Sequence, residues 1–463
     1  MDEGKKDIGR RDFLRALGAG AVVSTAALYG CKPRRSVEGG VTTAGEAPTD
    51  KMTYRTNPHS GDRVSLLGYG CMRWPMKPKA DGSGNEIDQE ATNELVDYAI
   101  AHGVNYFDVA PPYIQGLAEQ ATGIALKRHP REKFFIATKL SNMADNPRIR
   151  SFEGSRAIYM QSFKSLQVDH IDYYLLHSLG TLQGVMERFI DNGMLDFLMR
   201  EREAGRIRNL GFSFHGDIEA FDYLLARDMQ WDFVQIQLNY VDWKHASIGR
   251  NFNADYLYSE LVKRNIPAVI MEPLLGGRLS KLPEHLLARL KEARPQDSAA
   301  AWAFRYAGTP ENVLTVLSGM TYMEHLQENI RIYSPLEPLT DAERALLEGE
   351  VAELYARYPM VNCTTCNYCM PCPYGIDIPS VFAHYNRCVN EGNVSKSSQD
   401  ENYRRARRAF LVGYDRSVPA LRQANHCIAC DICVSRCPQR VRIPQEMSRI
   451  DKFVEQLKQG LEF

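Results

Sequence analysis

Eight of the eleven cysteines lie in two short runs near the C-terminal end, and each run is followed by a proline. The runs read CTTCNYCMPCP and CIACDICVSRCP, and the first three cysteines of the first run recur 64 residues later. This internal duplication supplies eight sulfur ligands, which could hold iron or zinc or pair as disulfides. The eight are Cys363, Cys366, Cys369, Cys372, Cys427, Cys430, Cys433 and Cys437.

The second run has the spacing C-x₂-C-x₂-C-x₃-C-P, in which three neighbouring thiolates hold one cluster and the fourth cysteine ligates another. The segment therefore resembles a bacterial two-cluster ferredoxin domain, and this resemblance implies two [4Fe–4S] clusters. By the same rule Cys437 serves the first cluster and Cys372 the second, although the shorter spacing before Cys372 leaves this partition open. The residues between the runs have helical character, so we expect a small α-helical domain in which Cys388 is a buried thiol.

Two other uses of these cysteines remain as alternatives. Two Cys₄ zinc sites would need only paired C-x₂-C knuckles, without four cysteines in one run and a trailing proline. Disulfides are conceivable in an oxidising compartment, but cysteines three residues apart are poorly placed to pair with one another. The spacing favours iron–sulfur clusters.

The segment that precedes the cysteines alternates short apolar runs with amphipathic helical patterns. We predict eight strands, nearly continuous in apolar character, as strands buried on both faces must be. They are residues 65–70, 104–108, 134–139, 171–176, 207–213, 233–238, 267–271 and 313–318. Eight strand–helix units in this length predict a (β/α)₈ barrel. The alternative is a doubly wound sheet, which would need a Gly-rich dinucleotide turn after the first strand. The sequence there reads LGYGCMRWP and does not supply that turn.

Ionisable residues stand at the ends of three successive predicted strands, where barrel enzymes place their active sites. They are Asp108, Lys139 and His177, with Tyr113 five residues beyond Asp108. The surrounding stretches GVNYFDVAPPYIQGLAEQATGIAL, IATK and YYLLH resemble the aldo/keto reductase family across nearly the whole barrel.

The resemblance implies that Tyr113 donates a proton while hydride comes from a nicotinamide ring. A free phenol has a pKa near 10, so we expect the Lys139 ammonium to lower the pKa of Tyr113. Asp108 would hold Lys139 in place, and His177 would orient the substrate carbonyl oxygen.

The same resemblance assigns a second set of residues to NADP(H) or NAD(H). Ser213 and Gln235 match residues that hold the nicotinamide, while Gly276 and Gly277 match the pyrophosphate loop. Glu328 and Asn329 match the adenine end. The basic residues that usually bind the 2′-phosphate are missing, because their positions read Gly319, Met320 and His325. Dinucleotide preference therefore stays open.

The first thirty-one residues have the layout of an export signal, with basic residues before an uncharged stretch too short to span a bilayer. The stretch GRRDFLRALGAGAVV resembles a twin-arginine signal, which implies export in the folded state. Leu28, Gly30 and Cys31 resemble a lipoprotein processing site; the alternative is an incidental cysteine. We expect a periplasmic or membrane-anchored protein.

The composition is that of an ordinary globular chain: 463 residues, 44% hydrophobic, with a net charge of −1. This balance gives no indication of nucleic-acid binding. We predict an export signal over 1–31, a linker over 32–51, the barrel over 52–335, and a C-terminal helix with the iron–sulfur domain over 336–463. Thr340 and Glu343 form a predicted capping box at the start of that helix.

The combined interpretation is an exported iron–sulfur oxidoreductase that interconverts a carbonyl and an alcohol on a small-molecule substrate and exchanges electrons with a redox protein. A second hypothesis is an electron-transfer protein whose barrel only binds a ligand or partner. A third is that the clusters are purely structural. Substrate and oligomeric state are not encoded in any motif that we recognise.

Overall fold

A computed structural model describes residues 46–460 apart from 145, 228, 247–252 and 396. The predicted export signal, Cys31 and most of the predicted linker lie outside the described residues. Residues from 46 onward belong to one compact unit, which contains both the barrel and the cysteine-rich segment.

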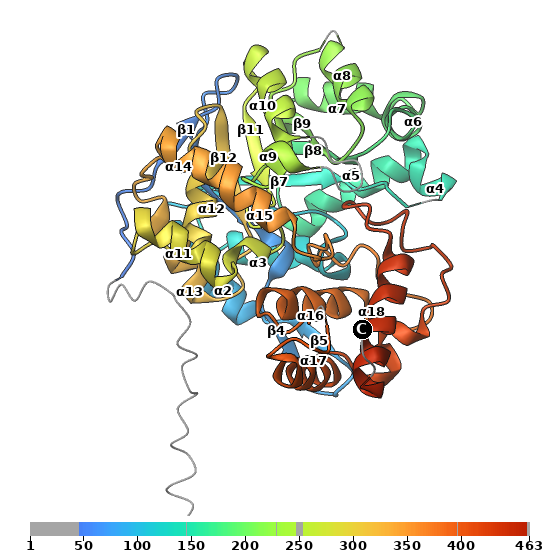
Figure 1. The fold of residues 1–463 in the computed structure, drawn as a ribbon. Helices are drawn as coiled ribbons and strands as arrows, with labels where there is room; N and C mark the ends of the chain where they lie inside the picture. Colours follow the sequence, from blue (N-terminus) through green and yellow to red (C-terminus); the bar gives the residue numbers. More distant parts are fainter. Residues whose placement is uncertain (1–45, 145, 228, 247–252, 396, 461–463) are drawn as a thin grey trace, which may run out of the picture. The chain divides into compact units, whose positions relative to one another are not determined.

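Eight parallel strands close into a barrel in the order β3-β6-β7-β8-β9-β10-β11-β12, as the sequence predicts. Figure 1 shows the strands surrounded by helices. The strands are β3 (Leu67–Gly70), β6 (Tyr106–Asp108), β7 (Phe135–Leu140), β8 (Ile171–Leu179), β9 (Ile207–Phe214), β10 (Phe233–Gln237), β11 (Ala268–Met271) and β12 (Val313–Ser318).

Side chains alternate between the inside of the barrel and the layer beneath the helices, as the two-residue period of a strand requires. Tyr106, Ala137 and Tyr173 belong to the core inside the barrel. Their chain neighbours Phe107 and Ile136 belong to the larger core between strands and helices. Strand residues next to one another in the chain therefore point to opposite sides of the barrel wall at these positions.

Helices connect the strands and cover the barrel. The predicted helix after the first strand is α2, which begins after Asp88, whose side chain accepts a hydrogen bond from the Ala91 amide. The α-helices of this part are α2 (Gln89–Ala101), α3 (Ala118–Leu126), α4 (Pro147–Arg150), α5 (Phe152–Leu166), α6 (Leu182–Val185), α7 (Met194–Glu203), α8 (Ile218–Ala226), α9 (Asp242–His245), α10 (Ala254–Lys263), α11 (Glu284–Ala293), α12 (Ala299–Gly308) and α13 (Met323–Ile332). Short helical turns are η1 (Cys71–Arg73), η2 (Tyr113–Gly116), η3 (Arg131–Lys133), η4 (Met186–Ile190) and η5 (Arg278–Ser280).

Two antiparallel hairpins, which the sequence analysis did not predict, accompany the barrel. The first pairs β1 (Tyr54–Thr56) with β2 (Arg63–Ser65), and the second pairs β4 (Met76–Pro78) with β5 (Asn85–Ile87). Strands of three residues are too short to show an alternating pattern, which explains why both were missed. Val64 of β2 is fully buried in the core inside the barrel, so the first hairpin helps to fill it.

The predicted helix after the barrel consists of three consecutive segments, α14 (Asp341–Leu346), η6 (Leu347–Val351) and α15 (Ala352–Ala356). The capping box of Thr340 and Glu343 is present at its start, as predicted. Helices α16 (Ile378–Asn390), α17 (Tyr403–Ser417) and α18 (Ile443–Gln459) follow, with the short turns η7 (Ala420–Arg422) and η8 (Ala424–His426).

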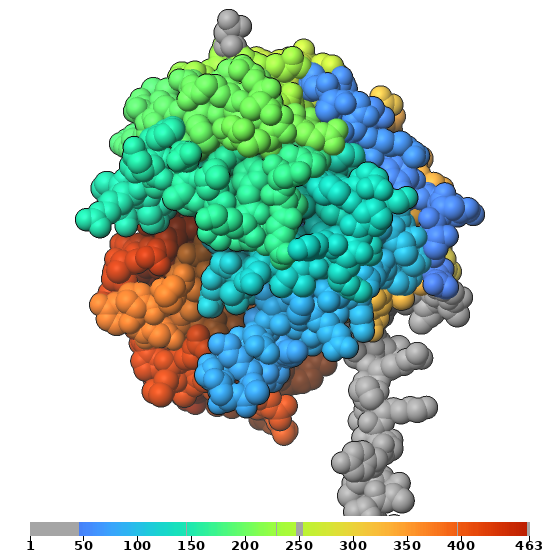
Figure 2. Space-filling view, turned by 180° about the vertical axis from the view of Figure 1, so that it is seen from behind, coloured from blue at the N-terminus to red at the C-terminus, as the bar shows by residue number. Residues whose placement is uncertain are grey.

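Helices α16, α17 and α18 share a second core, in which Cys388 is buried as predicted. Figure 2 shows the C-terminal residues, in orange and red, directly against the blue and teal surface of the barrel. No helix within the described residues has both the length and the apolar character needed to cross a bilayer.

Candidate active site and cysteine site

Strand parity brings three of the predicted catalytic residues together inside one end of the barrel. Asp108 ends β6 two residues after Tyr106, and Lys139 lies two residues after Ala137 in β7. His177 lies in β8, at the same parity as Tyr173. Since β6, β7 and β8 are neighbours in the sheet, the three side chains converge.

Asp108 and Lys139 form a buried ion pair. The Lys139 Nζ donates to Asp108 Oδ1 at 2.6 Å and to the Val109 carbonyl oxygen at 2.9 Å. The exposed fraction is 3% for Asp108 and 0% for Lys139. Burial raises the pKa of Asp108, while the charge of Lys139 opposes that rise.

Tyr113 reaches the same place from the loop after β6. Its backbone begins η2, whose next two residues, Ile114 and Gln115, have positive φ angles of 49° and 56°. The Lys139 Nζ lies 5.0 Å from the centroid of the Tyr113 ring, and the Tyr113 and His177 rings meet edge to face at 6.1 Å. The structure thus gathers all four predicted residues in one site.

The protonation of this site differs from what we expected. Burial raises the pKa of Tyr113 well above its usual value, and Tyr368 and Asp108 raise it further. The lowered pKa expected from the sequence is therefore not found, because burial outweighs the stabilisation of the phenolate by the nearby Lys139. Burial, with Lys139 and Arg188, holds the pKa of His177 well below its usual value, so this imidazole is neutral at neutral pH.

Two further residues, which the sequence analysis missed, fix His177. Ser141 Oγ lies 2.5 Å from His177 Nδ1, and the hydroxyl of Tyr368 lies 3.2 Å from His177 Nε2. Ser141 shares the parity of Lys139, so strand alternation could have revealed it. Tyr368 lies between Cys366 and Cys369, and no local signal indicates that it faces the barrel.

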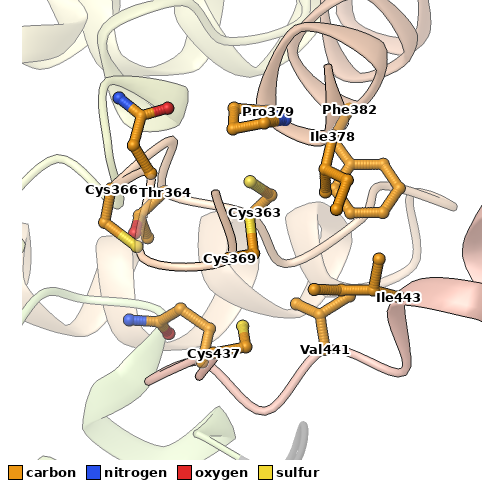
Figure 3. A pocket seen from close by; sticks show the side chains of 12 residues that line it. Cys363, Thr364, Cys366, Cys369, Ile378, Pro379, Phe382, Cys437, Val441 and Ile443 are labelled. Carbon is orange, nitrogen blue, oxygen red and sulfur yellow. The ribbon is translucent and has the colours of Figure 1, made fainter. Parts of the chain in front are cut away.

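The first three cysteines line one cavity together with Cys437, the residue that the crossed ligand rule assigns to the same cluster. Figure 3 shows these four side chains around one space, with apolar side chains on the opposite wall. That wall consists of Ile378, Pro379, Phe382, Val441 and Ile443. We call Cys363, Cys366, Cys369 and Cys437 the first cysteine group.

The remaining four cysteines, Cys372, Cys427, Cys430 and Cys433, form what we call the second cysteine group. The pKa of Cys433 is raised to about 11, first by burial and then by nearby Cys427, Cys430 and Cys372. Cys430 is exposed, whereas Cys369 of the first group is buried. The two groups therefore differ in their access to solvent.

The chemistry of the first group fits an iron–sulfur cluster. Burial raises the pKa of Cys363 to about 12 and of Cys366 to about 11, so without a metal these thiols keep their protons. Metal binding displaces such protons and yields the thiolate ligands that a cluster requires. The apolar wall would exclude water from that cluster. Among the described residues, no three His, Cys, Asp or Glu side chains are arranged to hold a single metal ion.

Most of the residues expected to bind a dinucleotide make contacts within the protein, although the buried Gln235 Oε1 has no hydrogen-bond partner among the described residues. Ser213 Oγ accepts from the Ser178 amide at 2.8 Å, and Gln235 Nε2 lies 3.5 Å from Met271 Sδ. Glu328 Oε1 accepts from Ser298 Oγ at 2.6 Å, and Asn329 Nδ2 donates to Ser318 Oγ at 3.0 Å.

Gly276, in the expected pyrophosphate loop, packs against the backbone of Thr364 from the cysteine-rich domain. A Cβ atom at Gly276 would lie 2.4 Å from Thr364 Cα, so no space for a phosphate remains between them. In this arrangement the barrel residues do not fit a bound dinucleotide.

The protein is of the oxidoreductase class, as indicated by its barrel, the buried ionisable site and the adjoining cysteines. The chain matches the aldo/keto reductase family over residues 66–349 and the 4Fe-4S dicluster domain over residues 362–442. It belongs to the aldo/keto reductase family and carries a C-terminal 4Fe–4S dicluster domain. The family match runs to residue 349, beyond the barrel boundary of 335 expected from the sequence.

Relatives resemble the barrel. "Probable aldo-keto reductase 1" of Glycine max is 27% identical over 292 residues, which cover 58% of this chain and 81% of that protein. "Protein tas" of Escherichia coli is 30% identical over 205 residues, 38% of this chain and 56% of that protein. An aldo-keto reductase of Bacillus halodurans, solved in its holo form, superimposes with a TM-score of 0.52 at 26% identity, covering 64% of this chain and 95% of that one.

Proposed function

We propose that the protein is an exported iron–sulfur oxidoreductase that interconverts a carbonyl and an alcohol beside Tyr113. In the reducing direction the carbonyl group takes up two electrons and two protons and becomes an alcohol. The observation that carries this proposal is the buried Asp108–Lys139 pair next to Tyr113 and His177, with the first cysteine group adjoining the same site.

The four residues have distinct roles in this reaction. Tyr113 holds its proton firmly at neutral pH, so it can donate only to an oxygen that gains negative charge during the reaction. The Lys139 ammonium next to the ring stabilises the phenolate left behind, and its ion pair with Asp108 holds it in place. Neutral His177 orients the carbonyl oxygen through Nε2.

The two cysteine groups support electron exchange with the outside of the protein. When bound, a [4Fe–4S] cluster would transfer one electron at a time. The second cysteine group has an exposed member, Cys430, and the neighbouring Leu421, Ile428 and Ile432 are exposed apolar residues. This surface would suit contact with a redox protein partner.

Export and anchoring belong to the proposal as well. The twin-arginine-like segment in residues 1–31 and Cys31 support a periplasmic protein with a lipid anchor at that cysteine, although both lie outside the described residues. Mass spectrometry of the protein from its native membrane would test the anchor, because acylation adds a defined mass to the N-terminal peptide.

One observation favours the second candidate, a barrel that only binds a ligand or partner. The Tyr368 hydroxyl occupies the position beside His177 Nε2 that a carbonyl oxygen would need. For the barrel to be catalytic, the Tyr368 side chain must therefore move away so that the substrate oxygen can reach His177 Nε2. In a binding platform, Tyr368 would stay where it is.

The deciding experiment uses protein purified without oxygen, with iron and sulfide assayed and the visible spectrum recorded. The dithionite-reduced holoprotein is then incubated with a panel of aldehydes and ketones, and alcohol formation is measured. Tyr113→Phe should lower turnover by about 10²- to 10⁴-fold while ligand binding is kept.

Tyr174→Phe is the matched control. It removes a buried tyrosine hydroxyl that has no hydrogen-bond partner in the described part of the chain, on the other side of the same barrel wall. Equal losses in both variants, or full turnover in Tyr113→Phe, would contradict the catalytic assignment. A loaded protein that converts no member of the panel would favour the binding platform.

A further inference from the structure

We propose that residues 362–368, which we call the cysteine loop, take the place of the dinucleotide in this barrel, so that the protein works without a nicotinamide cofactor. The inference goes beyond the proposed carbonyl chemistry, since it would hold equally for a barrel that only binds a ligand. It rests on contacts at two parts of the expected cofactor site, the pyrophosphate loop and the nicotinamide end.

The pyrophosphate part is closed by backbone. Gly276 has a φ of +67°, and a Cβ built there would lie 2.4 Å from Thr364 Cα and 2.6 Å from the Thr364 carbonyl oxygen. Cβ atoms essentially never come closer than 3.0 Å to another heavy atom, so the two chains touch as closely as glycine allows. A pyrophosphate group would need the space that Thr364 fills.

The cationic groups around this loop also point at the cysteine loop. Arg73 Nη2 donates to the Thr364 carbonyl at 2.7 Å and to Thr365 Oγ1 at 2.9 Å. Arg278, directly after the two glycines, donates to Asn362 Oδ1 at 2.6 Å. Guanidinium groups are the side chains best suited to bind phosphate, and here both contact protein oxygens.

An acidic residue, Glu272, lies beside Arg73 at this place. Burial raises the pKa of its carboxyl group, and the charge of Arg73 opposes that rise. A dinucleotide brought against the same loop would have to share Arg73 with this acidic group.

The nicotinamide part is covered from the same domain. Tyr368 stacks beside Tyr113 with ring centroids 6.5 Å apart and reaches His177. Gln439, which follows Cys437, donates through Nε2 to Gln237 Oε1 at 3.0 Å across the barrel end. The redox site nearest to Tyr113 is then the first cysteine group.

Two adjacent glycines supply a matched test. Gly276→Ala and Gly277→Ala both put a side chain on a residue with positive φ, at +67° and +95°, so they share the backbone strain. The new methyl group collides with Thr364 in the first variant, whereas in the second it meets no atom of the described residues within 4 Å. If this glycine loop instead held a dinucleotide, both substitutions would weaken dinucleotide binding.

The readouts are iron and sulfide per chain, the electron paramagnetic resonance spectrum of the reduced protein, and equilibrium titration with NADPH and NADH. We expect no binding of either nucleotide to the wild-type holoprotein up to about 1 mM. Gly276→Ala should lose about half of the iron, because one of two clusters is disturbed, while Gly277→Ala keeps all of it.

Stoichiometric NADPH or NADH binding to the wild-type holoprotein would overturn the inference. Full iron in Gly276→Ala would also overturn it. If Gly276→Ala does not fold, Arg278→Gln replaces it, and iron loss from the first site is again expected. None of these readouts requires turnover, so failure of the carbonyl chemistry leaves this test intact.

Discussion

Replacement of Lys139 by methionine would test the ion pair at the centre of the site. Lys139 is fully buried, and its Nζ donates to Asp108 at 2.6 Å. The second oxygen of that carboxylate, Oδ2, is already buried without a hydrogen-bond partner among the residues that the structure describes. Lys139→Met therefore leaves a buried carboxylate without compensation, and such a loss costs about 3–5 kcal/mol.

The loss should depend on pH, with a sign that follows from linkage. Burial raises the folded pKa of Asp108, and Lys139 opposes that rise, so Lys139→Met moves this pKa further above the unfolded value of about 3.9. Between those values the folded variant binds more protons than the unfolded chain, and its stability falls as pH rises. The destabilisation should thus be larger at about pH 8 than at about pH 5.

Denaturant unfolding followed by tryptophan fluorescence is the assay, since all four tryptophans lie between residues 74 and 302 and report the barrel. Lys127→Met, on an exposed lysine, is the control and should change stability by at most about 0.5 kcal/mol. The double variant Asp108→Asn, Lys139→Met should recover most of the loss at about pH 8. A destabilisation under about 1 kcal/mol in Lys139→Met, or one independent of pH, would refute the buried ion pair.

Two further predictions concern the cysteines and His177. Cys437→Ser should remove one cluster and Cys372→Ser the other, so the reduced variants should give different electron paramagnetic resonance spectra; identical spectra would contradict the crossed partition. Because the pKa of His177 lies well below its usual value, turnover should show no inflection near about pH 6.5. An inflection there that disappears in His177→Gln would show that His177 titrates in the functional range.

Much of the barrel could be predicted because strand geometry is local. Apolar runs of the right length identify the eight strands, and their two-residue period decides which side chains point inward. Asp108, Lys139 and His177 could be grouped because parallel neighbouring strands end at the same edge. The two short hairpins could not be predicted, since strands of three residues show no recognisable alternation.

The sequence by itself determined the ligand spacing of both cysteine runs, the eight strands and the residues at their ends, because each depends on contacts between residues close in the chain or on the alternation of a strand. Only the tertiary structure decided that Tyr368 meets His177 and that Thr364 closes on Gly276. These residues lie far apart in the chain, and their meeting depends on how two separately packed cores dock. The raised pKa of Tyr113 has the same origin, because burial at a domain contact leaves no trace in local sequence.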